Sequence, residues 1–550
     1  MPLGNFPAWI VARKWPICRI EDNQSLLSAI KKCHKITTIT SLSCNNDSSL
    51  DKVAYAKKVP RLFKQLKYSK FLKIFKDPLE TPSNLKTVIS RIKRLNTIKG
   101  LKLVSSNSFE NTRVKCFGTL KVLKHFNKLE TVVLHIFFVS NKISLFEKFG
   151  KLVQGFRAAK LTIKEPLTLI PEVFIRKFYF KVKETSKQLK VLKLSNYTPF
   201  AGSIKQFPPY KFLQKASNLS EVNLNFIGIT IKNSFLMYLC QLLKNFRYLS
   251  NLSLDLSFNQ ISDLNSLNEL KDISLKKLYL NFGHCPLGEN CFPQLAGLIS
   301  SHPELKSLKL LLSSLKMDEK SLLALIEPLR SLKKLEIITL DLEENRCISS
   351  TTFQKIFSQV FTSSLIVKVE LNLSRAFFGG LSKGLFGLNN QRRSYIKAFS
   401  LDISNNKLRE NEIVQIIRIL RSHTEIEELC LSIENMRLEG QASETIWEWI
   451  FSLKKLKSLE MSLIFSQIAE TNLFSLTKGL LKMDLEYLSL NLLETISARS
   501  SAETLVLAML STKCIKALKI NTGLLRQNFV CKFREKLKNH LPFCSRLEIS

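Results

Sequence analysis

Short fragments of the form apolar-x-x-apolar-x-apolar recur along the chain about 30 residues apart. The clearest copies are Leu219/Val222/Leu224, Leu249/Leu252/Leu254, Leu275/Leu278/Leu280, Leu305/Leu308/Leu310, Ile366/Val369/Leu371, Ile396/Phe399/Leu401, Ile426/Leu429/Leu431, Leu456/Leu459/Met461, Leu485/Leu488/Leu490 and Ile515/Leu518/Ile520. Weaker copies keep step upstream, at Ile98/Leu101/Leu103, Leu129/Val132/Leu134, Phe156/Ala159/Leu161 and Leu189/Leu192/Leu194, and a truncated copy ends the chain at Leu547 and Ile549. Residues 103 to 549 hold fifteen intervals, (549 − 103)/15, or about 29.7 residues each. A fixed period of this size predicts a solenoid, in which each repeat buries its apolar face against its neighbours.

One copy, between residues 310 and 371, can be placed in two ways. Both Leu332/Leu335/Ile337 and Ile337/Leu340/Leu342 fit the pattern. We prefer the second placement, because it leaves intervals of 32 and 29 residues.

Amphipathic stretches lie between the short apolar fragments. Their apolar residues recur at i, i+3, i+4 and i+7, as a helix with one buried side requires. The clearest stretches are residues 234–246, 320–329, 412–420, 445–451 and 472–481. Each repeat is therefore predicted to hold one strand and one helix.

One strand and one helix in about 30 residues resemble the ribonuclease-inhibitor-like leucine-rich repeat family. Besides the apolar positions, Asn405, Asn406 and Asn435 lie near the turn that this family places after the strand. The resemblance covers roughly residues 98–550 and implies an α/β leucine-rich repeat solenoid, a horseshoe with a parallel concave sheet and convex helices. The family includes inhibitors, receptors, scaffolds and ubiquitin-ligase adaptors, so the resemblance does not settle the function.

Two regions follow from the repeat: a basic N-terminal helical cap or extension over 1–97 and a solenoid of about 15–16 repeats over 98–550. Residues 52–76 are the most basic stretch, with a cation at every third position: Lys58, Arg61, Lys64, Lys67, Lys70, Lys73 and Lys76. We expect a helix here that bends near Tyr68 and Ser69. It would either cover the open end of the solenoid or bind an anionic membrane surface or nucleic acid.

The formal net charge of +38 is unevenly distributed. Residues 1–250 carry 45 Lys and Arg against 13 Asp and Glu, whereas residues 251–550 carry 38 against 32, giving +32 and +6. Such asymmetry favours a polyanionic partner or an acidic protein surface, although solubility alone could also explain it.

The residue between the last two apolar positions of each fragment should project into the concave face. This column is predicted to run from basic to mildly acidic, and its candidate binding residues are Lys102, Lys160, Lys193, Tyr279, Lys309, Asp341, Glu370 and Glu460, together with Lys58, Arg61, Lys64 and Lys67 from the N-terminal segment. A flanking column adds Asp255, Glu343 and Asp402. Aromatic residues are scarce in the column, so nucleic acid would be held by its phosphates rather than by base stacking.

No motif for catalysis or cofactor binding occurs: there is no phosphate-binding Gly-rich loop ending in Lys-Ser/Thr, no G-x-S-x-G and no H-E-x-x-H. His284, Cys285 and Cys291 lack a fourth ligand and the paired spacing of a zinc site. We therefore expect no enzyme, no cofactor and no metal. The absence of a long apolar run predicts no membrane span, and twelve scattered cysteines favour an intracellular protein, cytoplasmic or nuclear.

The leading hypothesis is a non-enzymatic scaffold that binds a protein partner on its concave face, with the basic N-terminal half favouring acidic partners. The alternatives are a nucleic-acid-associated protein that contacts phosphates, and an adaptor of the ubiquitin-ligase type.

Overall fold

The computed structural model describes residues 18–20, 38–42, 71–76, 100–105, 131–135, 160–165, 189–196, 216–346, 348–362, 365–376, 395–438, 440–466, 468–495, 499–508, 515–523, 530–531 and 546–549. The chain forms two compact units, residues 1–260 and 261–550.

In the first unit, parallel strands pair in the order of the sequence. They are β1 Cys18–Ile20, β2 Thr38–Leu42, β3 Phe71–Lys76, β4 Gly100–Ser105, β5 Thr131–His135, β6 Lys160–Glu165, β7 Val191–Asn196, β8 Glu221–Asn225 and β9 Asn251–Asp255. Helix α9, Asn233–Lys244, follows β8.

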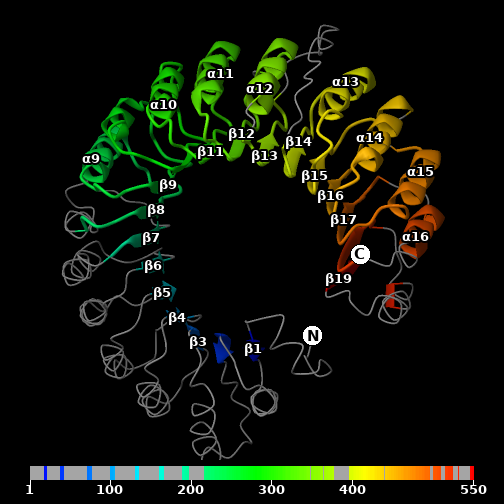
Figure 1. Cartoon of the computed structure of the whole chain (residues 1–550), viewed down its shortest axis with the longest axis horizontal. Helices are drawn as coiled ribbons and strands as arrows, with labels where there is room; N and C mark the ends of the chain where they lie inside the picture. The colour runs from blue at the N-terminus through cyan, green and yellow to red at the C-terminus, as the bar shows by residue number, and fades with distance from the viewer. Residues whose placement is uncertain are drawn as a thin grey trace, which may run out of the picture. The chain divides into compact units, whose positions relative to one another are not determined.

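The second unit repeats the same strand and helix arrangement. Its parallel strands are β10 Lys277–Asn281, β11 Ser307–Leu311, β12 Ile337–Asp341, β13 Lys368–Asn372, β14 Ala398–Asp402, β15 Glu428–Ser432, β16 Ser458–Ser462, β17 Tyr487–Asn491, β18 Ala517–Asn521 and β19 Arg546–Ile549. Its helices are η5 Asn265–Leu270, α10 Cys291–Ser300, α11 Glu319–Ile326, η6 Glu327–Ser331, α12 Ser350–Thr362, α13 Glu410–Leu420, α14 Gln441–Ser452, α15 Glu470–Leu480 and α16 Arg499–Ala508. Within this unit the helices lie on one side of the strands (Figure 1). We call the other side of the sheet its open face.

The core lies between strands and helices because both elements turn their apolar positions toward it. Leu308 and Leu310 of β11 are fully buried, and so are Ile413 and Ile417 of α13. In β11 and β13, buried apolar residues that face the core alternate with half-exposed residues on the open face. Parallel strands in register, with helices between them wherever the connecting segments are described in the second unit, form a leucine-rich repeat solenoid, as the sequence predicted.

Buried asparagines hold the turns that follow the strands. In Asn345, Nδ2 donates to the carbonyl oxygens of Leu312 and Leu342, and Oδ1 accepts from the backbone N–H groups of Leu315 and Met317. Asn259 and Asn406 make the corresponding bonds, each to one backbone carbonyl of the preceding repeat and one of its own repeat. These side chains satisfy backbone groups that the turns would otherwise leave buried and unpaired.

The residue before this asparagine position adopts a left-handed backbone in repeat after repeat. The residues are Gly228, Phe258, His284, Ser314, Glu344, Arg375, Asn405, Asn435, Phe465 and Glu494. Asn405 and Asn435 therefore belong to this outward turn position, whereas Asn406 is the buried structural asparagine. Asparagine suits both positions, but for different reasons: conformational tolerance in one and hydrogen bonding in the other.

The helix expected over residues 52–76 is wrong at its C-terminal end. Phe71–Lys76 forms strand β3, in which Leu72 and Ile74 pair with Leu101 and Leu103 of β4. The alternation Leu-Lys-Ile matches a strand, and pairing with β4 decided between that pattern and the lysine spacing. Residues 52–70 lie outside the described residues, and the boundary at residue 97 remains a prediction.

Two sequence copies were read in the wrong register. Strand β6 aligns Leu161 and Ile163 with Leu192 and Leu194, so the copy lies two residues later than predicted. In the copy around β12 the repeat positions are Leu335, Ile338 and Leu340, all buried, a set of three that neither placement gave in full. Both segments alternate apolar residues over a longer run than one strand needs, and a shift by two preserves that pattern.

Candidate functional site

The open face of the second unit carries a continuous central column of side chains, one from each strand. Strand register gives this column as Tyr279, Lys309, Thr339, Glu370, Ser400, Cys430, Glu460, Ser489, Lys519 and Glu548. Most of these side chains are half-buried, and Thr339 and Ser489 are buried. The predicted candidates Tyr279, Lys309, Glu370 and Glu460 thus share one surface.

Asp341 and Lys160 do not lie in the column where the sequence placed them. Thr339 occupies the position between Lys309 and Glu370, and Asp341 lies two residues further along β12. In the first unit, Thr162 pairs with Lys193, while Lys160 pairs with Val191 at the start of the strand. Both corrections follow from the register shifts above.

In the first unit, Lys102 of β4 pairs with Val133, and Lys193 occupies the same register position in β7. The Lys193 ammonium lies 2.8 Å from the Glu221 carboxylate, which partly neutralises it. Lys58, Arg61, Lys64 and Lys67 lie outside the described residues.

Neighbouring side chains in the column contact each other. The Lys309 Nζ lies 5.6 Å from the centre of the Tyr279 ring, a cation–π contact worth about 0.5–1 kcal/mol at a partly exposed site. The Glu370 carboxylate accepts a hydrogen bond from the Thr339 hydroxyl at 2.8 Å and pairs with the Lys368 ammonium at 2.7 Å. Burial opposes ionisation of Glu370, but these two partners outweigh it and lower the pKa of the carboxyl.

A second column, at the carboxyl ends of the strands, holds side chains that accept a hydrogen bond from the backbone N–H two residues later. Asn281, Asp341, Asn372 and Asp402 make this bond at 3.0, 3.1, 3.1 and 2.9 Å. Burial raises the pKa of the Asp341 carboxyl, and the nearby charges of Glu343 and Asp402 act in the same direction. Both the loss of solvent and the repulsion by neighbouring carboxylates therefore oppose ionisation of Asp341.

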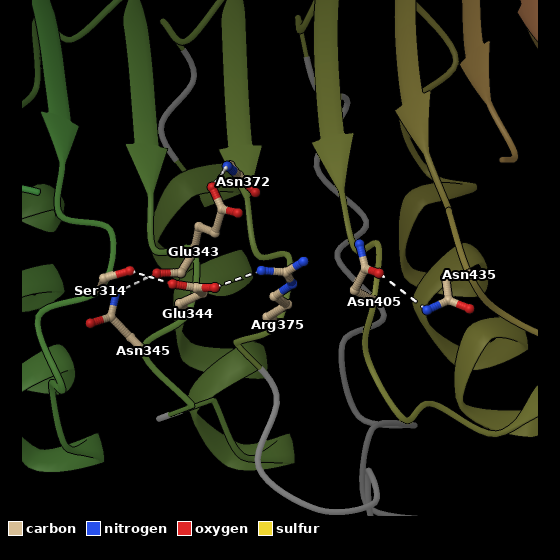
Figure 2. Close-up of polar contacts among 8 residues, drawn as sticks. All are labelled: Ser314, Glu343, Glu344, Asn345, Asn372, Arg375, Asn405 and Asn435. Atoms are coloured by element: carbon tan, nitrogen blue, oxygen red, sulfur yellow. Dashed lines mark hydrogen bonds and ion pairs between the residues drawn. The ribbon is translucent and has the colours of Figure 1, made fainter. Parts of the chain in front are cut away.

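The turns beyond the strands are linked from repeat to repeat by polar side chains (Figure 2). The Glu344 carboxylate accepts from the Ser314 hydroxyl and pairs with Arg375, both at 2.6 Å, and these partners lower the pKa of the Glu344 carboxyl. Asn435 Nδ2 donates to Asn405 Oδ1 at 3.2 Å. The carboxyl-end rim is thus a polar chain of contacts on the left-handed turn residues.

The opposite rim, at the amino ends of the strands, is built from ion pairs between adjacent repeats. Lys306 pairs with Glu336 and Lys334 with Glu304 before β12, at 2.8 and 2.6 Å. Lys397, directly before β14, pairs with Glu427 at 3.0 Å, and Lys455 pairs with Glu425 in the two repeats that follow.

On the same rim, four apolar side chains between Glu336 and Lys397 in the sequence are exposed. Ile337, Leu365, Val367 and Tyr395 are all exposed, Tyr395 by 60% and Leu365 by 49%. The pairing of Lys368 with Ala398 sets Leu365 and Tyr395 at the same level of adjacent repeats, about 5 Å apart in the sheet direction. We call these four residues the apolar edge. The sequence analysis did not identify the apolar edge. Alignment of the repeats by their period of 30 residues would have revealed it, because neighbouring copies have charged residues at the rim positions.

Cys285 and Cys291 are buried, and the Cys291 thiol donates to the Ser262 carbonyl oxygen at 3.3 Å. Among the described residues, no group of three or more His, Cys, Asp or Glu is arranged to hold a metal ion. The same part of the chain contains no helix that is both long and apolar enough to cross a membrane.

No protein-family model and no curated protein sequence matches the chain. A solved structure to which it is similar is that of a leucine-rich repeat protein from Leptospira interrogans, with 13% sequence identity, 96% of this chain and 99% of that chain covered, and a TM-score of 0.33. The fold assignment therefore rests on the repeats and paired strands of this chain itself.

Proposed function

We propose that the protein is a non-enzymatic scaffold that binds a protein partner on the open, concave face of its leucine-rich repeat sheet. The observation that carries this proposal is the central column: from β10 to β19, polar and charged side chains stand in register on a face that no described helix covers. In-register side chains on a rigid sheet offer a partner an extended array of fixed contacts.

The finer assignments belong to the same proposal. Repeats of about 30 residues, with a helix between most of the strands that the structure describes in the second unit, support the ribonuclease-inhibitor-like form of the fold. The balance of +32 over residues 1–250 supports an acidic partner for the N-terminal half. The scattered cysteines support a location inside the cell, cytoplasmic or nuclear. Pairing of Lys193 with Glu221 weakens the nucleic-acid alternative at that position, because a paired ammonium is less available to a phosphate.

The proposal is tested by capture of partners from cell extract with the full-length protein, with and without nuclease and at two salt concentrations. We expect protein partners that survive nuclease and are lost when the column is reversed by Lys309→Glu with Glu370→Lys. The matched control reverses charges on exposed helix positions, Lys478→Glu with Glu444→Lys, and should retain the partners. Partners that vanish with nuclease would transfer the function to nucleic acid, and partners that survive the column reversal would refute binding on this face.

A further inference from the structure

The carboxylates at the carboxyl end of the open face carry a charge that the fold does not require. Asp341 and Asp402 accept a backbone N–H bond that Asn281 and Asn372 accept equally well in neighbouring repeats. An amide oxygen therefore meets the structural need without a charge. The raised pKa of Asp341 shows that its charge opposes, rather than helps, the folded state.

The negative charge is concentrated over β12–β16. The carboxylates at the centre of these strands, at their carboxyl ends or in the turns directly beyond are Asp341, Glu343, Glu370, Asp402, Glu434 and Glu460. Glu370, Asp402 and Glu460 all act on the Cys430 thiol, whose pKa is raised first by burial and further by these charges. On the same part of the face the Lys368 ammonium pairs with Glu370 and offsets one of these charges, and the other five carboxylates leave a negative field over the surface.

The apolar edge completes this surface at the amino ends of the same strands. Ile337 and Asp341 are the first and last residues of β12, and four residues of a strand span about 13 Å. Exposed apolar side chains within a rim of ion pairs match the anatomy of a protein interface, an apolar centre within a polar border. The surface thus presents an apolar anchor point at one end and carboxylates about 13 Å away.

We propose that the open face of β12–β16, with the apolar edge, binds a Lys/Arg-rich segment of a protein partner that carries a large apolar side chain at one end. Charge complementarity selects this occupant: a cationic segment would neutralise the clustered carboxylates, Asp341 among them, and its apolar residue would cover Val367 and Tyr395. This inference rests on the proposed function, since it names the partner chemistry for the same face.

The test uses full-length protein and three fluorescein-labelled 14-residue peptides. The first peptide has Trp and Leu at one end and a Lys or Arg at every second position beyond them. The second peptide has Glu in place of these cations. The third peptide has Ser in place of Trp and Leu. Fluorescence anisotropy at low and moderate salt measures binding. We expect the first peptide to bind most tightly and its affinity to fall as salt rises.

The decisive variant removes charge without changing shape: Asp341→Asn, Asp402→Asn and Glu370→Gln together. We expect about a tenfold loss of affinity for the first peptide, or about 1.4 kcal/mol, since each of the three exposed charge pairs contributes roughly 0.5 kcal/mol. The converse change, Asn372→Asp, should strengthen binding two- to threefold by the same reasoning. Glu289→Gln, at an exposed loop position, is the control and should change nothing. Tyr395→Ser should weaken the first peptide toward the affinity of the third.

Unchanged affinity in the triple variant, or preference for the Glu peptide, would overturn the inference. A salt-dependent dimer of the full-length protein in sedimentation, lost in the triple variant, would also overturn it, by making a second copy the occupant. If the protein does not bind the cationic peptide but its captured partners still depend on the central column, only this inference is refuted. Partners indifferent to the column would remove the proposed function instead.

Discussion

Two buried histidines make the stability of the second unit depend on pH. His302 follows α10 and His423 follows α13, and their side chains are only 1% and 4% exposed. Burial lowers the pKa of each from 6.5 to about 4. The equivalent turns after other helices hold buried apolar residues, Phe246, Leu332 and Leu453.

The sign follows from the direction of the shift. A histidine whose pKa is lower in the folded state binds a proton more readily when unfolded, so its stabilising contribution is complete above about pH 6.5 and is lost as the pH falls toward 4. A shift from 6.5 to about 4 gives a full loss of about 3 kcal/mol per histidine. At pH 5 the loss is about 2 kcal/mol each.

Urea unfolding followed by circular dichroism at several pH values between 7.5 and 5 measures this loss. We expect the double variant His302→Leu with His423→Leu to lose about 4 kcal/mol less than the unchanged protein between these limits. Leucine is the residue at the matching positions 332 and 453, so stability at pH 7.5 should change little. Conversely, Leu453→His should add acid sensitivity. The reasoning is refuted if the double variant loses as much stability at pH 5 as the unchanged protein does.

Further predictions concern the turns and the helix packing. Asn345→Ala should destabilise the protein by about 3 kcal/mol, because it leaves buried backbone groups of two turns unpaired, whereas Asn435→Ala at the exposed turn should cost under about 1 kcal/mol; urea midpoints compare the two. Phe465→Asn should stabilise by up to about 1 kcal/mol, since residue 465 has φ +54° and Asn tolerates this conformation; a lowered melting temperature would contradict this. Gly479→Ala should destabilise by about 1–3 kcal/mol despite the better helix propensity of Ala, because a Cβ at residue 479 overlaps the Phe451 ring. Adding Phe451→Leu should recover part of that loss in the same thermal assay.

The sequence by itself determined the repeat, its period and its strand and helix content. Leu308 and Leu310 are two residues apart, as on one face of a strand, and Ile413 and Ile417 are four apart, as on one face of a helix. All four are buried in the structure. The predicted helices over 234–246, 412–420 and 472–481 correspond to α9, α13 and α15. Periodicity carries this information because every repeat must bury the same face against the next.

Only the tertiary structure decided which residue stands in which column of the open face. The segment from Ile338 to Leu342 alternates apolar and polar residues, so a slip of two residues leaves the pattern intact. Pairing with β11 and β13 selects Ile338 and Leu340 for the core, exposes Ile337 and places Thr339 rather than Asp341 beside Glu370. The apolar edge and the carboxylate surface join side chains from several repeats, and strand register is what brings those side chains together.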